Sequence, residues 1–214
     1  MKNSKKREEI ISTGKKLIIE KGFLNTSVED ITKKMGIAKG SFYTYFKSKD
    51  EFILAIISEK IFQRRHKVNE ILEKELSFEE TIKEFLAQSL SFPLIDTESF
   101  LIIMNLFKNI NLLSENVKIS ILDNTKLGNH DILKILNKYK DKLDLSDEND
   151  IDKYAYLIKA FINSFYENSF NPLMNFEKKE SHITISEIED CINKINLEKE
   201  INFMTKAVIK LILK

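Results

Sequence analysis

The sequence is poor in residues that break regular secondary structure. Its 214 residues include five glycines and two prolines, whereas average usage would give about 26 such residues in a chain of this length. Sandwiches, barrels and doubly wound sheets need a turn residue about every ten positions. The scarcity argues against all-β and α/β folds and favours long helices. Four of the five glycines lie in the first forty residues: Gly14, Gly22, Gly36 and Gly40.

Cysteine and long apolar runs are also scarce. The single cysteine, Cys191, excludes an internal disulfide framework and is typical of a protein in the reducing cytoplasm. The longest apolar runs, such as residues 53–57, are far shorter than the about 20 residues of a membrane-spanning helix. The charged start is followed by no apolar signal-peptide core. We therefore expect a cytoplasmic protein without a membrane segment.

The residue patterns of catalytic and metal sites are missing. His66, His130 and His182 are scattered through the sequence, and no HExxH motif or Cys-His cluster could hold a metal. There is no GxSxG motif and no glycine loop of the phosphate-binding type. Cys191 shares a predicted helix face with isoleucines, which is more typical of a core residue than of a reactive thiol. We expect no enzyme activity, no metal and no cofactor.

Charge is divided unevenly along the chain. Residues 1–50 carry 12 Lys and Arg against 6 Asp and Glu, a net charge of +6, whereas residues 51–214 carry 22 against 27, a net charge of −5. A basic front part on an acidic remainder indicates that the front part meets a polyanion. Chance clustering in a Lys-rich chain is the other explanation, and charge alone does not decide between them.

Helix starts are predicted by Ser or Thr followed three positions later by Glu, as in a capping box. Three such pairs precede apolar patterns of helical period: Thr26–Glu29, Ser48–Glu51 and Ser77–Glu80. With the apolar periodicity, they predict helices over residues 4–21, 27–35, 39–46, 48–75, 78–92, 97–113, 115–140, 151–170 and 185–213, the last with a break near 193–196. The fold class is all-α, and no repeat of fixed period indicates a solenoid.

Residues 26–47 read as a helix, a tight turn containing Gly36 and a second short helix. The spacing directs Ile37, Phe42 and Phe46 toward a core. One interpretation is a polar face that is merely solvated. The other is that its exposed tyrosines and hydroxyl groups form hydrogen bonds with phosphates and base edges. The second helix of a helix-turn-helix enters the DNA major groove. The residues left on the outer surface are Lys39, Ser41, Tyr43, Thr44, Tyr45 and Lys47.

Residues 9–54 resemble the DNA-binding domain of the TetR family of bacterial transcriptional repressors. The remainder of the chain resembles the family only in its length and helical character. The shared marks are Glu20-Lys21-Gly22-Phe23, Thr26-Ser27-Val28 with Ile31, Gly36-Ile37-Ala38-Lys39-Gly40-Ser41-Phe42-Tyr43, and Tyr45-Phe46-Lys47-Ser48-Lys49.

This resemblance implies an N-terminal three-helix helix-turn-helix domain at residues 1–48 and a larger helical ligand-binding and dimerisation domain at residues 49–214. Thr26 would cap the second helix and contact phosphate. Ala38 stands where many members have an N-capping Ser, so the third helix would depend more on packing. The groove would face Lys39, Gly40, Ser41, Tyr43 and Thr44, with Tyr45 and Lys47 on the phosphate backbone. The N-terminal cluster Lys2, Lys5, Lys6 and Arg7 would either contact DNA or form a solvated tail.

The helices at 151–170 and 185–213 are apolar around much of their girth and must be covered on more than one side. The resemblance implies that the second cover is the same helix pair of another subunit, giving a two-fold homodimer and a palindromic double-stranded DNA operator. Aromatic and methionine residues predict either ordinary core or a pocket for a small hydrophobic inducer. The candidate pocket residues are Phe100, Met104, Phe107, Phe161, Phe165, Tyr166 and Met174.

Together these features predict a DNA-binding transcriptional repressor that a small hydrophobic ligand releases from its operator. The alternative is a DNA-binding protein of the same fold with a structural or cell-division role and no inducer. A helical enzyme without a recognisable site is a weaker alternative.

Overall fold

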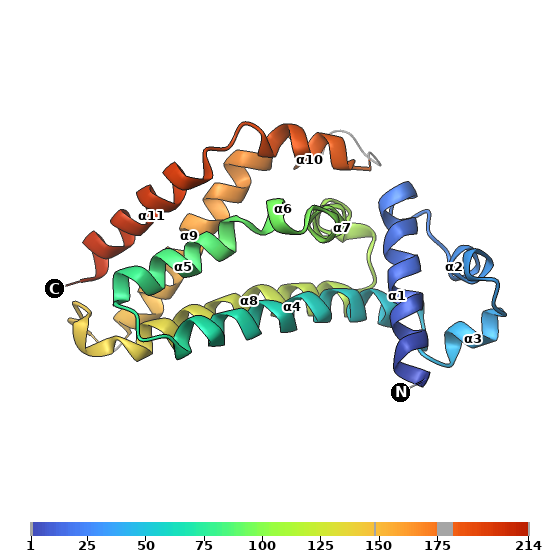
Figure 1. Ribbon diagram of the computed structural model, residues 1–214, viewed down its shortest axis with the longest axis horizontal. Coiled ribbons are helices and arrows are strands. Elements are labelled where there is room, and N and C mark those ends of the chain that lie inside the picture. Colours follow the sequence, from blue (N-terminus) through green and yellow to red (C-terminus); the bar gives the residue numbers. More distant parts are fainter. Residues whose placement is uncertain (1, 148, 175–181, 214) are drawn as a thin grey trace.

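The computed structural model describes residues 2–147, 149–174 and 182–213, without the side chains of residues 2–4, 61, 122–128 and 174. Helices dominate the described chain (Figure 1). The described residues contain no strand, and their single β-bridge joins Leu143 to Leu213 near the C-terminus. The predicted all-α class is confirmed. None of the described helices is both long enough and apolar enough to cross a bilayer.

The first three helices form a unit at one end of the molecule, which we call the head. They are α1 (Lys2–Lys21), α2 (Val28–Met35) and α3 (Lys39–Tyr43). Helix α1 contacts α2, and α2 contacts α3. As Figure 1 shows, α2 and α3 lie on the side of α1 that faces away from the other helices. This arrangement leaves α3 at the outer edge of the protein.

The remaining helices form the body. Helices α4 (Lys49–Glu73) and α8 (Glu115–Lys138) run side by side along one face (Figure 1). The helices α5 (Phe78–Leu90), α6 (Phe92–Ile95) and α7 (Thr97–Lys108) lie beyond them. They are followed by α9 (Asp150–Phe170), α10 (Ile185–Ile192) and α11 (Leu197–Ile212). Three short 3₁₀ helices complete the described fold: η1 (Ile110–Leu112), η2 (Lys140–Lys142) and η3 (Asn171–Met174).

Two of the three predicted capping boxes start helices where expected. Ser48 accepts the backbone N–H of Glu51 at the start of α4, and Ser77 and Glu80 form a full box before α5. The prediction for α2 is wrong by one residue, because Ser27 and Asp30 form its box. Thr26 instead donates its hydroxyl to the Gly22 carbonyl at 2.8 Å. Asp30, three positions after Ser27, takes the place that the pattern assigns to a glutamate.

Several predicted helix ends shift for local reasons. Helix α3 ends at Tyr43 rather than at Phe46, and its N-cap, Ala38, makes no side-chain bond. Pro93 lies in the first turn of α6 instead of stopping α5, a position where proline needs no N–H partner. The predicted helix 97–113 ends at Lys108 and continues as η1. The predicted break in the last helix is confirmed between α10 and α11.

The buried core is divided into three clusters, and the first of them joins head and body. It combines Ile10, Ile31 and Phe42 of the head with Ile53 and other residues of α4. Buried residues of α7 and α8 belong to the same cluster, including Ile102, Leu106, Val117 and Ile121. The head is therefore held on the body by shared apolar packing.

Gly14 permits the closest approach of α1 to α4. A Cβ atom at this position would lie 2.2 Å from Cζ of Phe52. Phe52 is only 1% exposed and packs on Phe42 and Phe46, with ring centroids 5.8 and 5.4 Å away. A ring so enclosed has little room to move, so the glycine is needed for packing.

We therefore expect Gly14→Ala to destabilise the protein, although alanine is the better helix former. Overpacking should lower the free energy of unfolding by about 1 to 3 kcal/mol. The better helix propensity of alanine should raise it by up to about 1 kcal/mol, so the net loss of stability is about 1 kcal/mol. Chemical unfolding measures it. Gly40→Ala is the control, because no atom lies within 4 Å of its Cβ position. Equal stability of the two variants would contradict the steric explanation.

Candidate functional site

Aromatic residues hold the short helix α3 in place. Phe42 is fully buried and Phe46 is 1% exposed, and their rings lie 5.4 Å apart. Gly36, in the turn before α3, has φ +64°, and its backbone N–H closes α2, a conformation that glycine adopts without strain. Five residues are too few to form a stable helix alone. The orientation of α3 is therefore fixed by this packing.

Most of the residues predicted to bind DNA lie on the outer side of α3 and the turn after it. Lys39, Gly40, Thr44 and Lys47 are exposed. Tyr43 is 46% exposed, and its ring meets the Phe42 ring edge-on at 5.6 Å. Ser41 and Tyr45 are half-buried. No atom lies within 4 Å of a Cβ placed on Gly40, so another molecule can approach the backbone closely there.

Thr26 is placed differently from the other candidates. The residue is only 2% exposed, and its hydroxyl is used within the chain by the bond to Gly22. The expectation that Thr26 caps α2 is therefore wrong. Ser27, which does cap it, is exposed at the start of α2. The candidates within residues 39–47 are thus exposed or half-buried, whereas the Thr26 side chain is buried.

Some lysines of the head form ion pairs within the chain and others do not. Lys21 pairs with Asp30 at 2.9 Å and Lys33 with Glu29 at 2.7 Å. Hydrogen bonds from Ser27 and then Lys21 hold the pKa of Asp30 well below its usual range. Lys39 and Lys47 belong to no ion pair within the described part of the chain. Their charges are therefore available to an anion.

Lys49 has a structural role that its place in the motif does not show. Its ammonium donates to the Phe23 carbonyl at 2.8 Å and lies 4.1 Å from the centre of the Phe23 ring. Burial lowers its pKa. Lys49 thus ties the start of α4 to the loop between α1 and α2.

The N-terminal basic cluster belongs to helix α1, which begins at Lys2. The guanidinium of Arg7 lies 5.0 Å from the centre of the Phe46 ring, directly beside the turn that follows α3. Lys5 and Arg7 are exposed, whereas the side chain of Lys2 lies outside those described. The cluster is helical where it is described.

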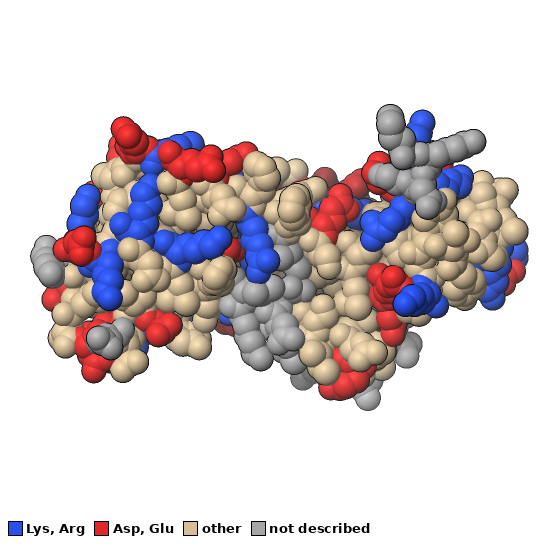
Figure 2. Space-filling model, turned by 90° about the horizontal axis from the view of Figure 1, so that it is seen from below, with Lys and Arg blue, Asp and Glu red and all other residues tan. Residues whose placement is uncertain are grey.

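Basic residues are not confined to the head. Figure 2 shows Lys and Arg interspersed with Asp and Glu at both ends of the molecule on the face seen from below. Exposed body lysines on α4 and α8 include Lys67, Lys134 and Lys138. The division of net charge along the sequence therefore does not become a single continuous patch on this face.

The predicted pocket residues are spread over three core clusters. Phe107 packs against the cluster shared by head and body, and Phe161 and Phe165 belong to the cluster at the far end of the body. Phe100 and Met104 belong to the third, and Tyr166 borders the last two. Met174 ends η3, but its side chain lies outside those described. The six residues whose side chains are described are thus divided among these clusters.

An aromatic group does form around Phe100. Its ring centroid lies 5.8 Å from those of Phe92 and Tyr166 and 4.7 Å from that of Phe170. Tyr166 donates its hydroxyl to the Ser89 carbonyl, and burial raises its pKa. We call these four residues the aromatic group. It joins α6, α7 and α9.

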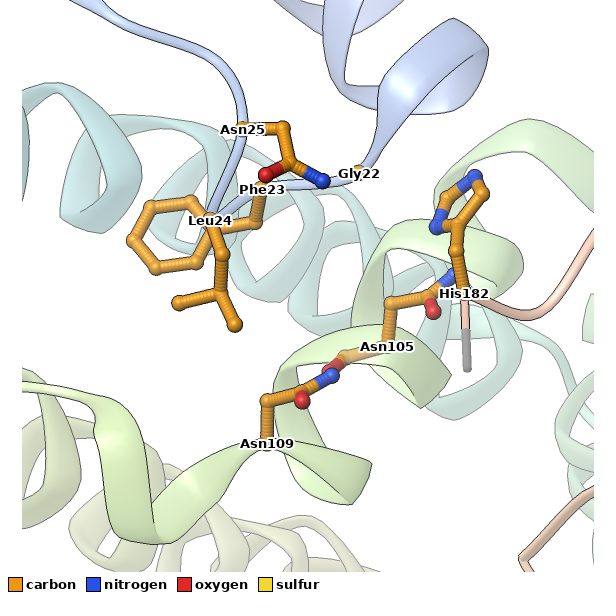
Figure 3. Close-up of a pocket in the computed structure, with 7 residues that line it drawn as sticks. All are labelled: Gly22, Phe23, Leu24, Asn25, Asn105, Asn109 and His182. Atoms are coloured by element: carbon orange, nitrogen blue, oxygen red, sulfur yellow. The ribbon is translucent and has the colours of Figure 1, made fainter. Parts of the chain in front are cut away.

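A small hollow lies where the head meets the body (Figure 3). A ring nitrogen of His182 lies 2.9 Å from the Ile19 carbonyl at the end of α1. The buried amide of Asn105 on α7 bonds both backbone groups of Ile183, at 2.9 and 3.1 Å. The hollow of about 30 Å³ has room for water but not for an organic effector. Its lining is Gly22, Phe23, Leu24, Asn25, Asn105, Asn109 and His182.

No sequence pattern predicts this junction, because its parts lie far apart along the chain. His182 and Ile19 are separated by 163 positions, and Asn105 and Ile183 by 78. No motif relates them. The contacts nevertheless tie α1 and α7 to the segment that leads into α10.

Large apolar side chains remain exposed on two of the helices predicted to form the dimer. Tyr156 and Leu157 on α9 are 63% and 41% exposed, and Phe203 and Leu211 on α11 are 67% and 47% exposed. Exposed apolar groups of this size commonly mark a protein interface.

Comparison with known proteins assigns the head. Residues 10–56 match the family model described as bacterial regulatory proteins, tetR family. A segment covering 37% of this chain is 40% identical to an uncharacterized HTH-type transcriptional regulator of Lactococcus lactis, and one covering 40% is 29% identical to the HTH-type transcriptional repressor NemR of Escherichia coli. These matches span less than half of either relative, 41% and 43%.

Solved structures agree with the fold over the whole chain. A putative TetR-family transcriptional regulator from Mesorhizobium loti covers 100% of both chains with a TM-score of 0.66 and 15% identity. At that identity the likeness concerns the fold alone. The family model covers residues 10–56 and the helix-turn-helix geometry agrees with it, so the head resembles the DNA-binding domain of the tetR family of bacterial regulatory proteins.

Proposed function

We propose that this protein is a transcriptional repressor that binds a specific DNA operator through α3. The observation that carries the proposal is the outer side of α3 and its following turn, where hydrogen-bonding side chains stand on a rigid aromatic base. Helix-turn-helix proteins place such a helix in the major groove. The name of the E. coli relative, a repressor, supports repression rather than activation.

The candidate residues divide into two roles. Ser41, Tyr43 and Thr44 offer hydroxyl groups that can donate to or accept from base edges. Lys39 and Lys47 carry unpaired charge, and Tyr45 a hydroxyl, for phosphates beside the groove. Thr26 contributes at most its backbone, since its side chain is buried.

A homodimer accounts for the exposed apolar faces of α9 and α11. A two-fold interface buries the same residues on both subunits. Each subunit would therefore bury the same four side chains: Tyr156, Leu157, Phe203 and Leu211. Two heads related by that axis would read two half-sites of a palindrome. In this division, residues 1–48 bind DNA and residues 49–214 dimerise and bind the effector.

Release by a small molecule is the second part of the proposal. An effector weakens DNA binding only if it prefers the state in which the heads do not fit the operator. The bonds of His182 and Asn105 provide a connection from the body to the end of α1. The alternative is a DNA-binding protein of this fold with a structural or cell-division role and no inducer.

A mobility-shift titration separates these functions. The operator is selected from a random duplex pool, and the complex is then exposed to hydrophobic cations and acyl compounds. Specific binding released by one compound is the expected result. Specific binding resistant to every compound would favour the structural role, and no specific binding at low salt would contradict both.

Tyr43→Ala and Lys47→Ala should weaken binding in different ways. Loss of Tyr43 should cost about 1 to 3 kcal/mol on the operator and less on random DNA. Loss of Lys47 should weaken both equally and lower the salt slope by about 1. Fluorescence anisotropy at several salt concentrations measures this.

Two exposed body residues outside the proposed interface provide the controls, Phe62→Ala and Lys67→Ala. Neither control should change the affinity for operator or random DNA. Equal losses on operator and random DNA for Tyr43→Ala would contradict a role in specificity.

Phe203→Glu should dissociate the dimer. A charge in the centre of an apolar interface should cost more than about 2 kcal/mol of association, and the operator affinity should fall with it. Sedimentation equilibrium measures the mass. Phe62→Glu is the matched control, because Phe62 on α4 is 70% exposed but lies outside the proposed interface. If both variants keep the mass of the unaltered protein, the interface is elsewhere.

A further inference from the structure

The basic residues at the start of α1 differ in their surroundings. Lys6 pairs with Glu9 at 3.1 Å. Lys5 and Arg7 are both exposed, but two positions correspond to about 200° around a helix, so they face different sides of α1. The guanidinium of Arg7 lies over the Phe46 ring, 5.0 Å from its centre. The charge of Arg7 is thus placed beside the turn that follows α3.

The Phe46 ring is a rigid platform for this charge. Phe46 is 1% exposed, and its ring centroid lies 5.4 Å from those of Phe42 and Phe52. The same rings hold α3 in place. A guanidinium over an aromatic ring is attracted by the negative face of the ring, so the long Arg7 side chain loses part of its freedom before any partner binds. The position of the Arg7 charge is therefore tied to that of α3, although Arg7 belongs to α1.

Arg7 has hydrogen-bonding capacity that the described part of the chain does not use. Its side chain forms no hydrogen bond and no ion pair with any described residue. A guanidinium carries five N–H donors in a fixed plane, which match the oxygens of a phosphate. Lys47, whose charge is also unpaired among the described residues, directly follows Phe46 in the sequence. Positive charge thus reaches this turn from two elements, α1 and the turn itself.

The start of α1 lies at the end of the head that carries α3. Figure 1 shows the N-terminal turns of α1 beside α3 and the connection from α3 to α4, and far from α10 and α11. A duplex that receives α3 in its major groove presents phosphates along both edges of that groove. Residues beside α3 on the same side of the head meet these phosphates.

We propose that Arg7, held on the Phe46 ring, binds a backbone phosphate of the operator beside the groove that α3 enters. This inference rests on the proposed function and adds a residue of α1 to the DNA-binding surface. Arg7 precedes residues 10–56, which match the family model, so that match does not assign it this role. A phosphate contact carries no sequence information, and its effect is to fix the orientation of the head on the duplex.

A purely structural contact between α1 and the turn is the other explanation. Such a contact needs only an apolar side chain over the ring, and a cation over an exposed ring adds little to stability. The surrounding charge favours a phosphate. Residues 1–50 carry a net charge of +6, and the nearby carboxylate of Glu9 is paired with Lys6. An anion from outside the chain is therefore the partner that the Arg7 charge lacks.

The salt dependence of DNA binding tests this role. Arg7→Gln removes the charge, and fluorescence anisotropy measures its binding to operator and random duplexes at several salt concentrations. It should weaken both by about tenfold and lower the salt slope by about 1, because one contact that releases a counterion is lost. Arg7→Lys keeps the charge and should keep the slope.

Lys16→Gln is the matched control. Lys16 is exposed on the same helix, about 180° around it from Arg7, and the substitution changes the charge equally. It should keep both the affinity and the slope. An equal fall in slope for Lys16→Gln and Arg7→Gln would mean that only the net charge of the head matters, and would overturn the inference.

Thermal unfolding of the same variants separates contact with DNA from support of the fold. A purely structural role would lower the melting temperature of Arg7→Gln and weaken operator binding without changing the salt slope. An unchanged slope in Arg7→Gln therefore overturns the inference, whatever the stability of the variant.

Uncharged phosphates locate the contact. Each operator duplex of a series carries one methylphosphonate in place of a phosphate. At one position beside the groove, this change should weaken binding of the unaltered protein but not that of Arg7→Gln. If every position affects the two proteins equally, Arg7 binds no phosphate.

The two proposals can fail separately, because phosphate binding does not depend on sequence. Specific binding with an unchanged slope in Arg7→Gln overturns this inference and leaves the proposed function intact. A lower slope on random DNA without any specific binding does the reverse. Absence of all DNA binding at low salt overturns both.

Discussion

The packing of Phe42 and Phe46 on Phe52 is the interaction on which the rest of the structure depends. It joins α3, too short to be stable alone, to the first turns of α4. The close approach of α1 at Gly14 completes the enclosure of Phe52. The three buried rings fix the orientation of α3 and of the turn after it. They therefore also fix the positions of the exposed residues Tyr43 and Lys47. Substitutions in this cluster would therefore alter DNA contact without touching DNA.

Helix α4 then carries this arrangement into the body. Along its length it pairs with different elements: Glu59 with Lys15 of α1, Lys60 with Asp96 before α7, and Arg64 with Asp131 of α8. A change at the Arg64–Asp131 pair therefore acts on the same helix that holds α3. His182 provides a second connection, from the segment before α10 to the end of α1. The body is thus joined to the end of α1 and, through α4, to the packing that holds α3.

The sequence predicts local features of this protein better than its long-range contacts. Capping residues, Gly36 and the apolar period locate most helices because each signal acts within a few residues. The same reasoning misplaced the cap of α2, because it expected Thr26 with Glu29 whereas the adjacent pair, Ser27 with Asp30, forms the cap. It singled out the α3 segment through a contiguous motif. It missed the Arg64–Asp131 pair and the His182 junction, whose residues meet only after the helices pack, and it grouped aromatic residues that belong to separate clusters.

Backbone amide chemical shifts, followed during titration with a selected operator duplex, locate the surface that meets DNA. The largest changes are expected within residues 39–47 and at the exposed start of α2, with small changes across α9 and α11. Random duplex should shift the same residues less. Changes that are largest in the body and absent from residues 39–47 would contradict the claim that α3 and its following turn form the DNA-binding surface.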